Sequence, residues 1–354
     1  MGQGTGPVTA RVQVWTGGAG FEERRVPLPE PGPGETLVRV RLATVCGSDL
    51  HTVSGRRPGP APGVLGHEGV GEVVAAGPGA VTVAGEPLVL GDRVVWGVVV
   101  SCGDCDRCRA GRAAKCRRAR KIGHEPYEGG ELFGCYATHV HLPTGMPIVA
   151  APRELPDAVA APAGCATATV AAVMAAAIAA AGPLTGRRVL VSGAGMLGLT
   201  AMAMAAEAGA AEITAVDLDA DRLRLAAAFG ATRAGTPDEP PPTADVALEF
   251  SGAAGAVASG LAALDVGGVL VLAGSVAPGP AVAVDPERVV RNWLTVTGVH
   301  NYESHHLADA ITFLARTAAT RPWGDLVAEP VPLSATASAL GAGPGRAPRA
   351  SVAP

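Results

Sequence analysis

A glycine-rich turn constrains the fold of this chain more than any other stretch of its sequence. Gly193, Gly195 and Gly198 stand between an apolar, strand-like segment at 187–192 and an alanine-rich, helix-like segment at 199–210. Glycines at this spacing allow a tight turn and let a pyrophosphate approach the free amides and the dipole of the helix N-terminus. A chance glycine-rich turn is the alternative, but the flanking strand and helix favour a βαβ unit with a dinucleotide site.

An acidic residue extends this interpretation. Asp217 ends the next strand-like segment, about 20 residues beyond the glycines, where a carboxylate accepts hydrogen bonds from an adenosine ribose. Leu218 and Asp219 follow, and a second acid would repel a 2′-phosphate, so the sequence favours NAD over NADP. Arg222, about one helical turn further along, leaves use of both cofactors as the lesser alternative.

Strand-like and helix-like segments alternate from 185 to 300, which predicts a doubly wound parallel sheet. Before it, alternating apolar residues at 11–15 and 36–45 predict a β-rich domain. The composition changes from β-type to helix-type near residue 160. A chain of 354 residues exceeds one usual core, so we expect an α/β protein of two domains.

Charge and hydropathy argue against nucleic-acid and membrane partners. A net charge of −4 gives no overall attraction to nucleic acid or to an anionic membrane. The first 15 residues lack the basic start and apolar core of a secretory signal, so we expect a cytoplasmic protein. The alanine-dominated run at 166–182 is shorter than a bilayer span normally needs, which favours a buried helix.

Four of the seven cysteines fall in one short segment, and a cytoplasmic chain is expected to use cysteines for metals more than for disulfides. The four are Cys102, Cys105, Cys108 and Cys116. Four thiolates close a tetrahedral shell around zinc and leave no open position, so this lobe predicts a structural zinc site. Unligated or disulfide-bonded cysteines are the alternative.

A second group of metal-binding side chains occurs earlier, between 46 and 68. Cys46 and His67 suit zinc, and Asp49 and Glu68 beside them are candidates to orient the ligands or to support the metal. Two ligands do not complete a site, because a catalytic zinc takes three protein ligands and keeps one position for water or substrate.

The remaining cysteines and two histidines are less informative. Cys165 stands alone at an alanine-rich helix entrance, so by itself it is expected to be a packing residue more often than a ligand. Cys135 is expected to be a small buried hydrophobe. His139 and His141 alternate on one strand-like segment, within 131–145, and are expected to be structural.

Basic residues follow the four-cysteine lobe at 117–124. A solvated basic face is the more common explanation of such a run. An anion-binding contribution from Lys121 or His124 is the alternative.

The segments "CGSDLH", "GHE", the four-cysteine lobe and "GAGMLG", in this order, resemble the zinc-dependent medium-chain alcohol dehydrogenases over nearly the whole chain. The resemblance implies a GroES-like, β-rich catalytic domain at 1–160 with 301–354, which carries the structural zinc lobe at 102–116. It implies a Rossmann NAD-binding domain at 161–300. "AGCATAT" is similar to the family segment that supplies the third catalytic zinc ligand, which is Cys165 here, although many polyol-type relatives have a glutamate in this region.

The resemblance also implies individual roles. Ser48 receives the substrate proton, His51 relays it to solvent, Asp49 supports His67, and Glu68 is an outer acid able to exchange onto zinc. Residues expected to contact the cofactor by motif or by resemblance are Thr169, Gly193, Gly195, Leu197, Gly198, Asp217, Arg222, Gly274, Val299 and Arg349, the last at the pyrophosphate.

A narrower resemblance is to the subgroup described as phosphonate-catabolism-associated alcohol dehydrogenases, carried by "CGSDLHTVSGRRP", "APAGCATATV", "GAGMLGLT" and "TGVHNYESHHL". It implies an anionic substrate. The candidate charge partners are Arg56, Arg57, Lys121, His124, Arg291 and His300.

The sequence therefore predicts an NAD-dependent zinc alcohol dehydrogenase with two zinc ions per chain. It would transfer a hydride between an alcohol and NAD to give an aldehyde or ketone, and the narrower resemblance adds alcohols that bear a phosphonate or another anion to the expected substrates. An NAD-retaining epimerase or lyase on the same scaffold is one alternative, and a non-catalytic zinc- and nucleotide-binding protein is the other. A homodimer or homotetramer is expected, with the apolar strands at 267–276 and 293–299 as a pairing edge.

Overall fold

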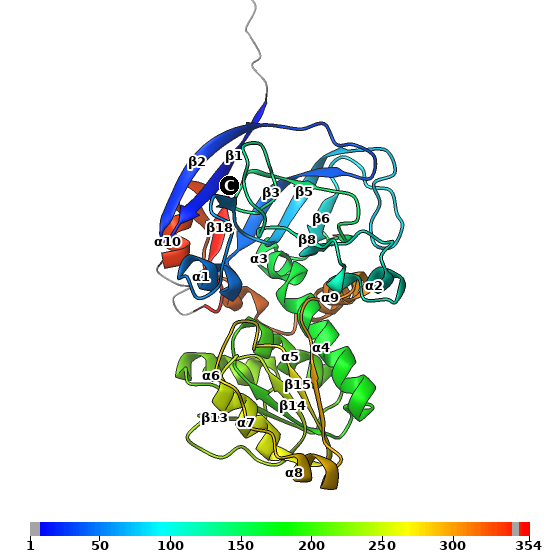
Figure 1. Ribbon diagram of the computed structural model, residues 1–354, viewed down its shortest axis with the longest axis vertical. Coiled ribbons are helices and arrows are strands. Elements are labelled where there is room, and N and C mark those ends of the chain that lie inside the picture. Colours follow the sequence, from blue (N-terminus) through cyan, green and yellow to red (C-terminus); the bar gives the residue numbers. More distant parts are fainter. Residues whose placement is uncertain (1–7, 342–346) are drawn as a thin grey trace, which may run out of the picture. The chain divides into compact units, whose positions relative to one another are not determined.

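The computed structural model describes residues 8–341 and 347–354, and the chain forms two compact units (Figure 1). The first unit comprises residues 1–165, 303–318 and 323–354, and the second comprises 166–302 and 319–322. These boundaries lie within a few residues of the changes in sequence pattern near 160 and 300.

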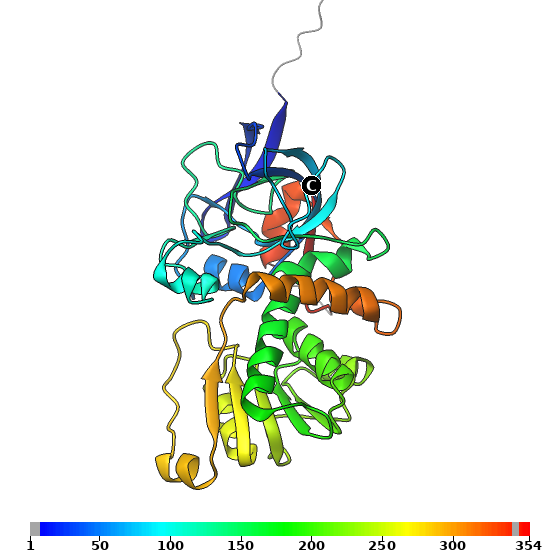
Figure 2. The ribbon, with the colours of Figure 1, turned by 90° about the vertical axis from the view of Figure 1, so that its right-hand side faces the viewer.

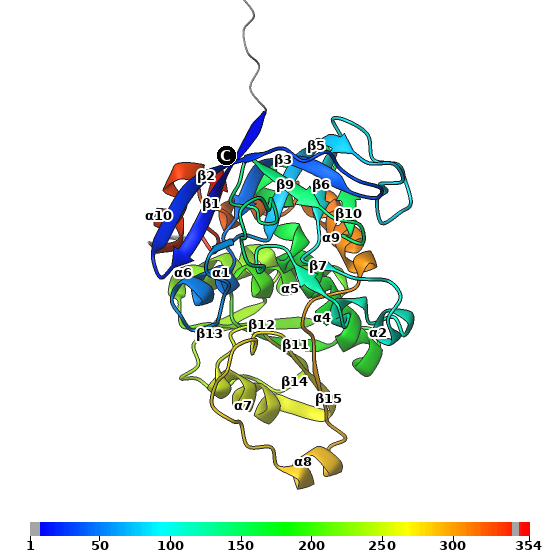
Figure 3. The same ribbon diagram turned by 45° about the horizontal axis from the view of Figure 1, so that its top comes forward.

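The first unit is built on sheets that are antiparallel except for the pair β17 and β18, which is parallel. In the larger sheet, whose strands β3, β5, β6 and β9 are seen side by side in Figure 3, the order is β10-β6-β5-β3-β18-β17, and β9 also pairs with β3. Its strands are β3 (Thr36–Thr44), β5 (Glu68–Ala76), β6 (Arg93–Trp96), β9 (His139–Leu142), β10 (Ile148–Ala150), β17 (Val331–Pro332) and β18 (Ser351–Ala353). A three-stranded sheet contains β1 (Thr9–Gly17), β2 (Gly20–Pro27) and β4 (Gly63–Val64). A two-stranded sheet contains β7 (Val99–Val100) and β8 (Arg120–Lys121).

Apolar side chains from these strands form the core of the first unit. Val38, Val94, Trp96 and Leu142 are fully buried and belong to one hydrophobic cluster. The strand β18 lies between β3 and β17, so a segment near residue 352 completes a sheet whose other main strands come from the first 150 residues.

Short helices connect the strands of the first unit. They are α1 (Gly47–Val53), α2 (Asp106–Arg109), η1 (Ala113–Lys115), α3 (Asp157–Ala160), η2 (Ala161–Gly164), α9 (Ser304–Thr317), η4 (Trp323–Leu326), η5 (Leu333–Ala335) and α10 (Thr336–Gly341). The sequence predicted one strand-like segment through 131–145, but only β9 is a strand there. Gly134 packs directly on the backbone of Val64. The amides of Cys135 and Tyr136 bond to the carbonyls of Gly66 and Leu65, so the segment 134–136 pairs with a loop and does not extend the sheet.

The second unit is a six-stranded parallel sheet in the order β13-β12-β11-β14-β15-β16, with β16 at one edge (Figure 2). The strands are β11 (Arg188–Ser192), β12 (Glu212–Val216), β13 (Arg233–Gly235), β14 (Ala244–Glu249), β15 (Leu264–Leu272) and β16 (Thr295–Gly298). The helical segments are α4 (Ala166–Ala181), α5 (Met196–Glu207), α6 (Ala220–Ala226), η3 (Ala227–Phe229), α7 (Ala254–Ala263) and α8 (Pro286–Arg291). This order confirms the predicted doubly wound sheet.

The alanine-rich helix α4 packs against α5 and β15. Among the described residues, no single helix is long and apolar enough to cross a membrane. One pair of helical segments is long and apolar enough only when taken together, and it is bent by 56° at the break between Asp157–Gly164 and Ala166–Ala181.

Candidate active site and metal centres

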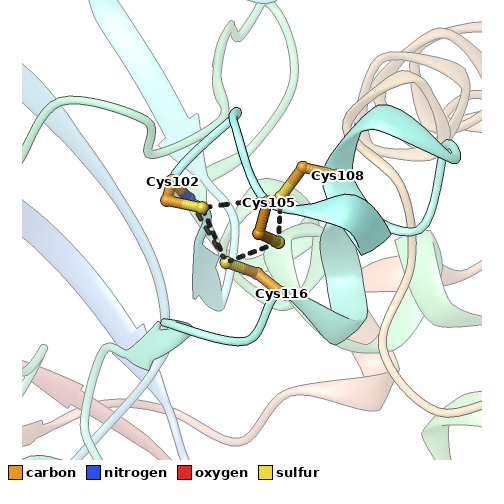
Figure 4. Close-up of side chains that lie close together, drawn as sticks. All are labelled: Cys102, Cys105, Cys108 and Cys116. Atoms are coloured by element: carbon orange, nitrogen blue, oxygen red, sulfur yellow. Dashed lines mark hydrogen bonds between the residues drawn. The ribbon is translucent and has the colours of Figure 1, made fainter.

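The four-cysteine lobe brings its sulfur atoms together, as the sequence predicts. Figure 4 shows the side chains of Cys102, Cys105, Cys108 and Cys116 turned toward one another. Measured Sγ–Sγ distances are 3.3 Å between Cys102 and Cys116, 3.4 Å between Cys105 and Cys108, and 3.9 Å for two further pairs. A tetrahedral zinc with Zn–S bonds of about 2.3 Å separates its sulfurs by about 3.8 Å, so the cluster fits the metal. All seven cysteines of the chain are free.

The lobe is held to the start of α9. Glu303 accepts hydrogen bonds from the backbone amides of Ala113 and Ala114, both at 3.0 Å. These amides lie in η1, directly before Cys116. One carboxylate therefore fixes the turn that delivers the last sulfur of the cluster.

A second cluster gathers Cys46, His67, Glu68 and Cys165, whose donor atoms all lie within 4.8 Å of one another. All four residues belong to the first unit, with Cys165 at its end, between η2 and α4. Cys46, His67 and Glu68 are buried and Cys165 is partly buried, and two thiols, an imidazole and a carboxylate form a donor set that suits zinc. Cys165, which looked like a packing residue by itself, is thus brought to Cys46 and His67.

Local structure explains how Cys46 and His67 are positioned. Cys46 is the N-cap of α1, and its backbone amide donates to Asp49 Oδ2 at 3.0 Å, so the helix begins directly after β3. Asp49 Oδ1 also lies 3.4 Å from His67 Nδ1. A carboxylate behind a histidine in this way fixes the orientation of the ring and leaves the other nitrogen for a metal.

Glu68 lies at the start of β5, and its carboxylate is fully buried. It accepts a hydrogen bond from Thr44 Oγ1 at 2.6 Å and pairs with Arg349 Nη2 at 3.2 Å. The same guanidinium nitrogen is 3.6 Å from Cys46 Sγ. Arg349, predicted at the cofactor pyrophosphate, thus has its guanidinium beside the second cluster of the first unit.

The protonation preferences follow from these contacts. A hydrogen bond from Cys165, with the charges of Arg349 and His67, holds the pKa of Cys46 well below its ordinary value despite burial. The partner thiol, Cys165, has its pKa raised well above the ordinary value by that same bond and by burial. Cys46 is therefore the more acidic thiol of the pair. Burial also raises the pKa of Glu68 to about 7, although Arg349 opposes the shift.

The two candidate proton carriers lie on α1. Ser48 Oγ is 3.3 Å from His67 Nε2, so its hydroxyl lies beside the metal-binding cluster. His51 is half-buried one turn further along the helix, and its carbonyl accepts from the amide of Arg57 at 3.0 Å.

The glycine turn of the second unit has the close packing that its sequence predicts. A side chain at Gly198 would lie 1.7 Å from the carbonyl oxygen of Gly193, which itself has a φ of 95°. Gly195 caps the N-terminus of α5. Asp217, just after β12, accepts from the amide of Ala194 at 2.6 Å, so the acid and the glycine turn lie together.

The remaining predicted cofactor residues also lie in the second unit. Thr169 and Leu197 are partly exposed on α4 and α5. Gly274 follows β15, and a side chain there would lie 2.4 Å from the amide nitrogen of Gly252. Val299 follows β16 and its amide bonds to the carbonyl of Leu272 at 2.9 Å. Arg222 lies 3.6 Å from Asp219, which caps α6.

The six predicted substrate contacts separate into two sets. Arg57, Lys121 and His124 belong to the first unit, and the amide of His124 bonds to the carbonyl of Lys121 at 3.1 Å. Burial lowers the pKa of His124 to about 3, and the charges of His67, Arg57 and Lys121 add to this shift. Of the other three, Arg56 is exposed on the same loop as Arg57. Arg291 and His300 belong to the second unit, where Arg291 pairs with Glu287 at 3.0 Å and His300 is exposed.

Sequence reasoning missed two residues that support the cluster. Tyr136 donates its hydroxyl hydrogen to Asp49 Oδ2 at 3.1 Å, and Thr44 bonds to Glu68. Tyr136 is 87 residues from Asp49 in the sequence, so no spacing rule pointed to it. The histidines expected to be structural each have a side-chain partner: His139 contacts the adjacent Thr138, and His141 contacts Glu35, 106 residues earlier in the chain.

Two family models match the chain. The alcohol dehydrogenase GroES-like domain matches residues 32–153, and the zinc-binding dehydrogenase model matches residues 197–316. An L-threonine 3-dehydrogenase from Chelativorans sp. (strain BNC1) is 34% identical over 303 residues, which cover 80% of this chain and 81% of the relative. A 5-exo-hydroxycamphor dehydrogenase from Pseudomonas putida is 36% identical over 234 residues, 63% of this chain and 58% of the relative.

Solved structures agree with these matches. An alcohol dehydrogenase from Thermotoga maritima has a TM-score of 0.91 at 26% identity and covers 98% of this chain and 100% of its own. A zinc-binding dehydrogenase from Sinorhizobium meliloti 1021, bound to NADP, has a TM-score of 0.85 at 26% identity, with 98% and 100% covered.

The chain belongs to the zinc-dependent medium-chain alcohol dehydrogenase family. It is an oxidoreductase that acts on an alcohol, and the family implies zinc and a nicotinamide cofactor.

Proposed function

We propose that the protein catalyses reversible, NAD-linked oxidation of a small alcohol to an aldehyde or ketone. The observation that carries this proposal is the buried donor cluster of Cys46, His67, Glu68 and Cys165, with the hydroxyl of Ser48 3.3 Å from His67. A buried metal-binding cluster beside a proton-accepting hydroxyl suits alcohol chemistry better than a purely structural role.

In this proposal Cys46, His67 and Cys165 hold a catalytic zinc, and the four-cysteine lobe holds a second, structural zinc. A bound zinc acts as a Lewis acid that makes a hydroxyl easier to deprotonate. Asp49 orients His67. Arg349, which does not bind the metal, keeps the carboxylate of Glu68 beside the three ligands.

The chain's own groups then carry the proton. Ser48 receives it from the substrate hydroxyl, and His51 on the same helix passes it to solvent. Bound NAD supplies the hydride acceptor. The glycine turn at 193–198 holds its pyrophosphate, and Asp217 accepts from the adenosine ribose.

The choice of NAD over NADP rests on Asp217 and Asp219. Both carboxylates lie at the end of β12, and Arg222, the nearest cation in sequence, is directed to Asp219. A 2′-phosphate would therefore meet negative charge. A phosphonate-bearing alcohol belongs among the candidate substrates, because the cations near His124 suit an anionic group.

We also propose that two copies associate through β16. This strand is an edge of the parallel sheet, and Val296 on it and Trp293 beside it are 44% and 80% exposed. An unpaired, apolar edge strand is a template for pairing with a second chain.

The test is an NAD-reduction screen across simple alcohols, polyols and hydroxyalkylphosphonates, combined with a zinc count. We expect NADH to appear with at least one alcohol and two zinc ions per wild-type chain. His67→Ala should abolish turnover and lower the zinc count to one. Retained activity with one zinc per chain would refute the assignment.

The same screen separates the alternatives. An NAD-retaining epimerase or lyase would convert substrate without net NADH release, which product analysis at constant absorbance detects. A non-catalytic protein would bind zinc and NAD yet convert none of the alcohols.

A further inference from the structure

We propose that Lys121 and Arg57 form a binding subsite for an acidic group on the substrate, so that the preferred alcohols carry a carboxylate, phosphate or phosphonate. This inference rests on the proposed alcohol oxidation at the Cys46, His67 and Cys165 cluster.

The direction of Lys121 follows from its strand. β8 consists of Arg120 and Lys121 and pairs with β7, with Lys121 opposite Val99. Successive side chains of a strand point to opposite faces. The guanidinium of Arg120 lies over the ring of Phe133, 4.7 Å from its centroid, so Lys121 points away from that ring.

Lys121 is half-buried, and two cations, Arg57 and Lys115, act on it. Burial, followed by the charges of Arg57 and Lys115, lowers its pKa. No acidic side chain forms an ion pair with Lys121 or Arg57 in the part of the chain that the structure describes. The neighbouring carboxylate of Glu125 accepts from the backbone amide of Lys121 at 2.8 Å.

Nearby basic residues behave differently. Arg117 pairs with Asp106, and Arg118 pairs with Asp104, and all four side chains are more than half exposed. A solvated basic face therefore explains 117–118. It does not explain Lys121, because a half-buried ammonium beside a second cation loses hydration and gains no attraction. An anionic ligand supplies the missing partner.

The subsite lies close to the reacting centre. Lys121 and His124 form one turn, since the amide of His124 bonds to the carbonyl of Lys121 at 3.1 Å. Gly123 in that turn packs on the loop of His67 so tightly that a side chain there would lie 2.4 Å from the carbonyl oxygen of Gly66. The ring of His124 is 4.9 Å from the ring of His67.

Arg57 belongs to the loop that follows α1, and its charge acts on both Lys121 and His124. Its amide bonds to the carbonyl of His51 at 3.0 Å, which holds the 54–57 loop against α1, the helix of Ser48. The turn of Lys121 is thus joined to the ring beside His67, and the loop of Arg57 is joined to the helix of Ser48, which places both cations to meet an acidic group on a substrate whose hydroxyl lies at Ser48. A fixed guanidinium fork and a compact ammonium suit an oxyanion with two or three oxygen atoms.

The experiment compares three substrates that differ in charge: hydroxyethylphosphonate, hydroxypropionate and propanol. The wild-type enzyme should prefer one of the anions. Lys121→Met and Arg57→Met should each lower kcat/KM for that anion by about 10- to 100-fold and change the value for propanol less than about twofold. The preference for phosphonate or for carboxylate identifies the acidic group.

Arg120→Gln is the matched control, because it removes the same charge from the adjacent residue on the opposite face of β8. It should leave the selectivity for the anion unchanged. The subsite would be refuted by any of three results. Lys121→Met and Arg57→Met could lower kcat/KM for the anion and for propanol equally, Arg120→Gln could lower the selectivity for the anion as much as they do, or the wild type could prefer propanol.

A binding measurement separates this inference from the proposed function. If no alcohol is oxidised, thermal unfolding of the zinc-loaded protein with hydroxyethylphosphonate still reports on the subsite. A rise in Tm for the wild type and for Arg120→Gln, but not for Lys121→Met, supports the subsite while the oxidation fails. Equal shifts in all three proteins, or none, refute it.

Discussion

Arg93 and Arg41 bind the same aspartate from different environments, which allows a matched test of how the chain leading to Cys165 is held. Arg93 on β6 has a side chain that is 7% exposed and contacts Asp157 at 2.7 Å. It also donates to the carbonyl oxygens of Pro152 and Leu155 at 2.5 and 2.7 Å. Arg41 contacts Asp157 at 2.8 Å with a side chain that is 46% exposed.

Replacing Arg93 by methionine keeps the aliphatic stem and removes all of these bonds. A buried carbonyl oxygen, a partly buried one and part of a carboxylate then lack a partner, so we expect the free energy of unfolding to fall by about 3–5 kcal/mol. Arg41→Met removes one exposed ion pair and should cost less than about 1 kcal/mol.

Urea unfolding of the zinc-loaded protein, followed by tryptophan fluorescence, measures the difference. Trp15, Trp96 and Trp323 lie in the first unit, so the fluorescence mainly reports on it. With an m-value of about 2–3 kcal/mol per M, the midpoint should fall by about 1–2 M for Arg93→Met and by less than about 0.5 M for Arg41→Met. Equal shifts for the two variants would show that burial does not decide the value of these contacts.

Three further predictions concern other parts of the chain. Cys105→Ser should lower the zinc content from two ions to one and reduce the melting temperature, measured by metal analysis and calorimetry; an unchanged zinc count would exclude the lobe as a metal site. Asp217→Asn should raise the KM for NAD by about tenfold and change the KM for NADP less, and equal changes would argue against the ribose contact. Arg188→Met should destabilise the second unit by about 1 kcal/mol at neutral pH, because Arg188 bridges to Asp245. A hydrogen bond from Arg188 lowers the pKa of Asp245 below its ordinary value of 3.8. The stabilisation by this ion pair is therefore present above pH 3.8 and is lost as the pH falls through the pKa of the folded state. A difference in unfolding free energy between wild type and variant that persists in strong acid would contradict the pairing.

The features that the sequence predicted are those with short spacing. The glycine turn lies within six residues and the four-cysteine lobe within fifteen, so one local segment specifies each of them. The helix α1 was not predicted, because a seven-residue segment that begins with Gly47 and ends with Val53 has little helical preference. It forms where Asp49 accepts the amide of Cys46.

The contacts that shape the second cluster come from distant parts of the sequence. Arg349 and Glu68 are 281 residues apart, and Tyr136 and Asp49 are 87 apart. No periodicity or spacing joins such pairs. Cys165 taken alone suggested a packing residue, and only the resemblance to a known family indicated a zinc ligand. The local sequence does not show that Cys165 lies beside Cys46 and His67, because the fold of the whole first unit brings them together.

The position of β18 has a consequence for synthesis of the chain. β3 pairs with β18 through Thr44 opposite Ser351 and Ala43 opposite Val352. On the ribosome, most of the second unit, at 166–302, is complete while this edge of β3 still lacks its partner. The nascent chain thus carries an open, apolar strand edge until residue 353 emerges, and such edges are where unfinished chains associate wrongly.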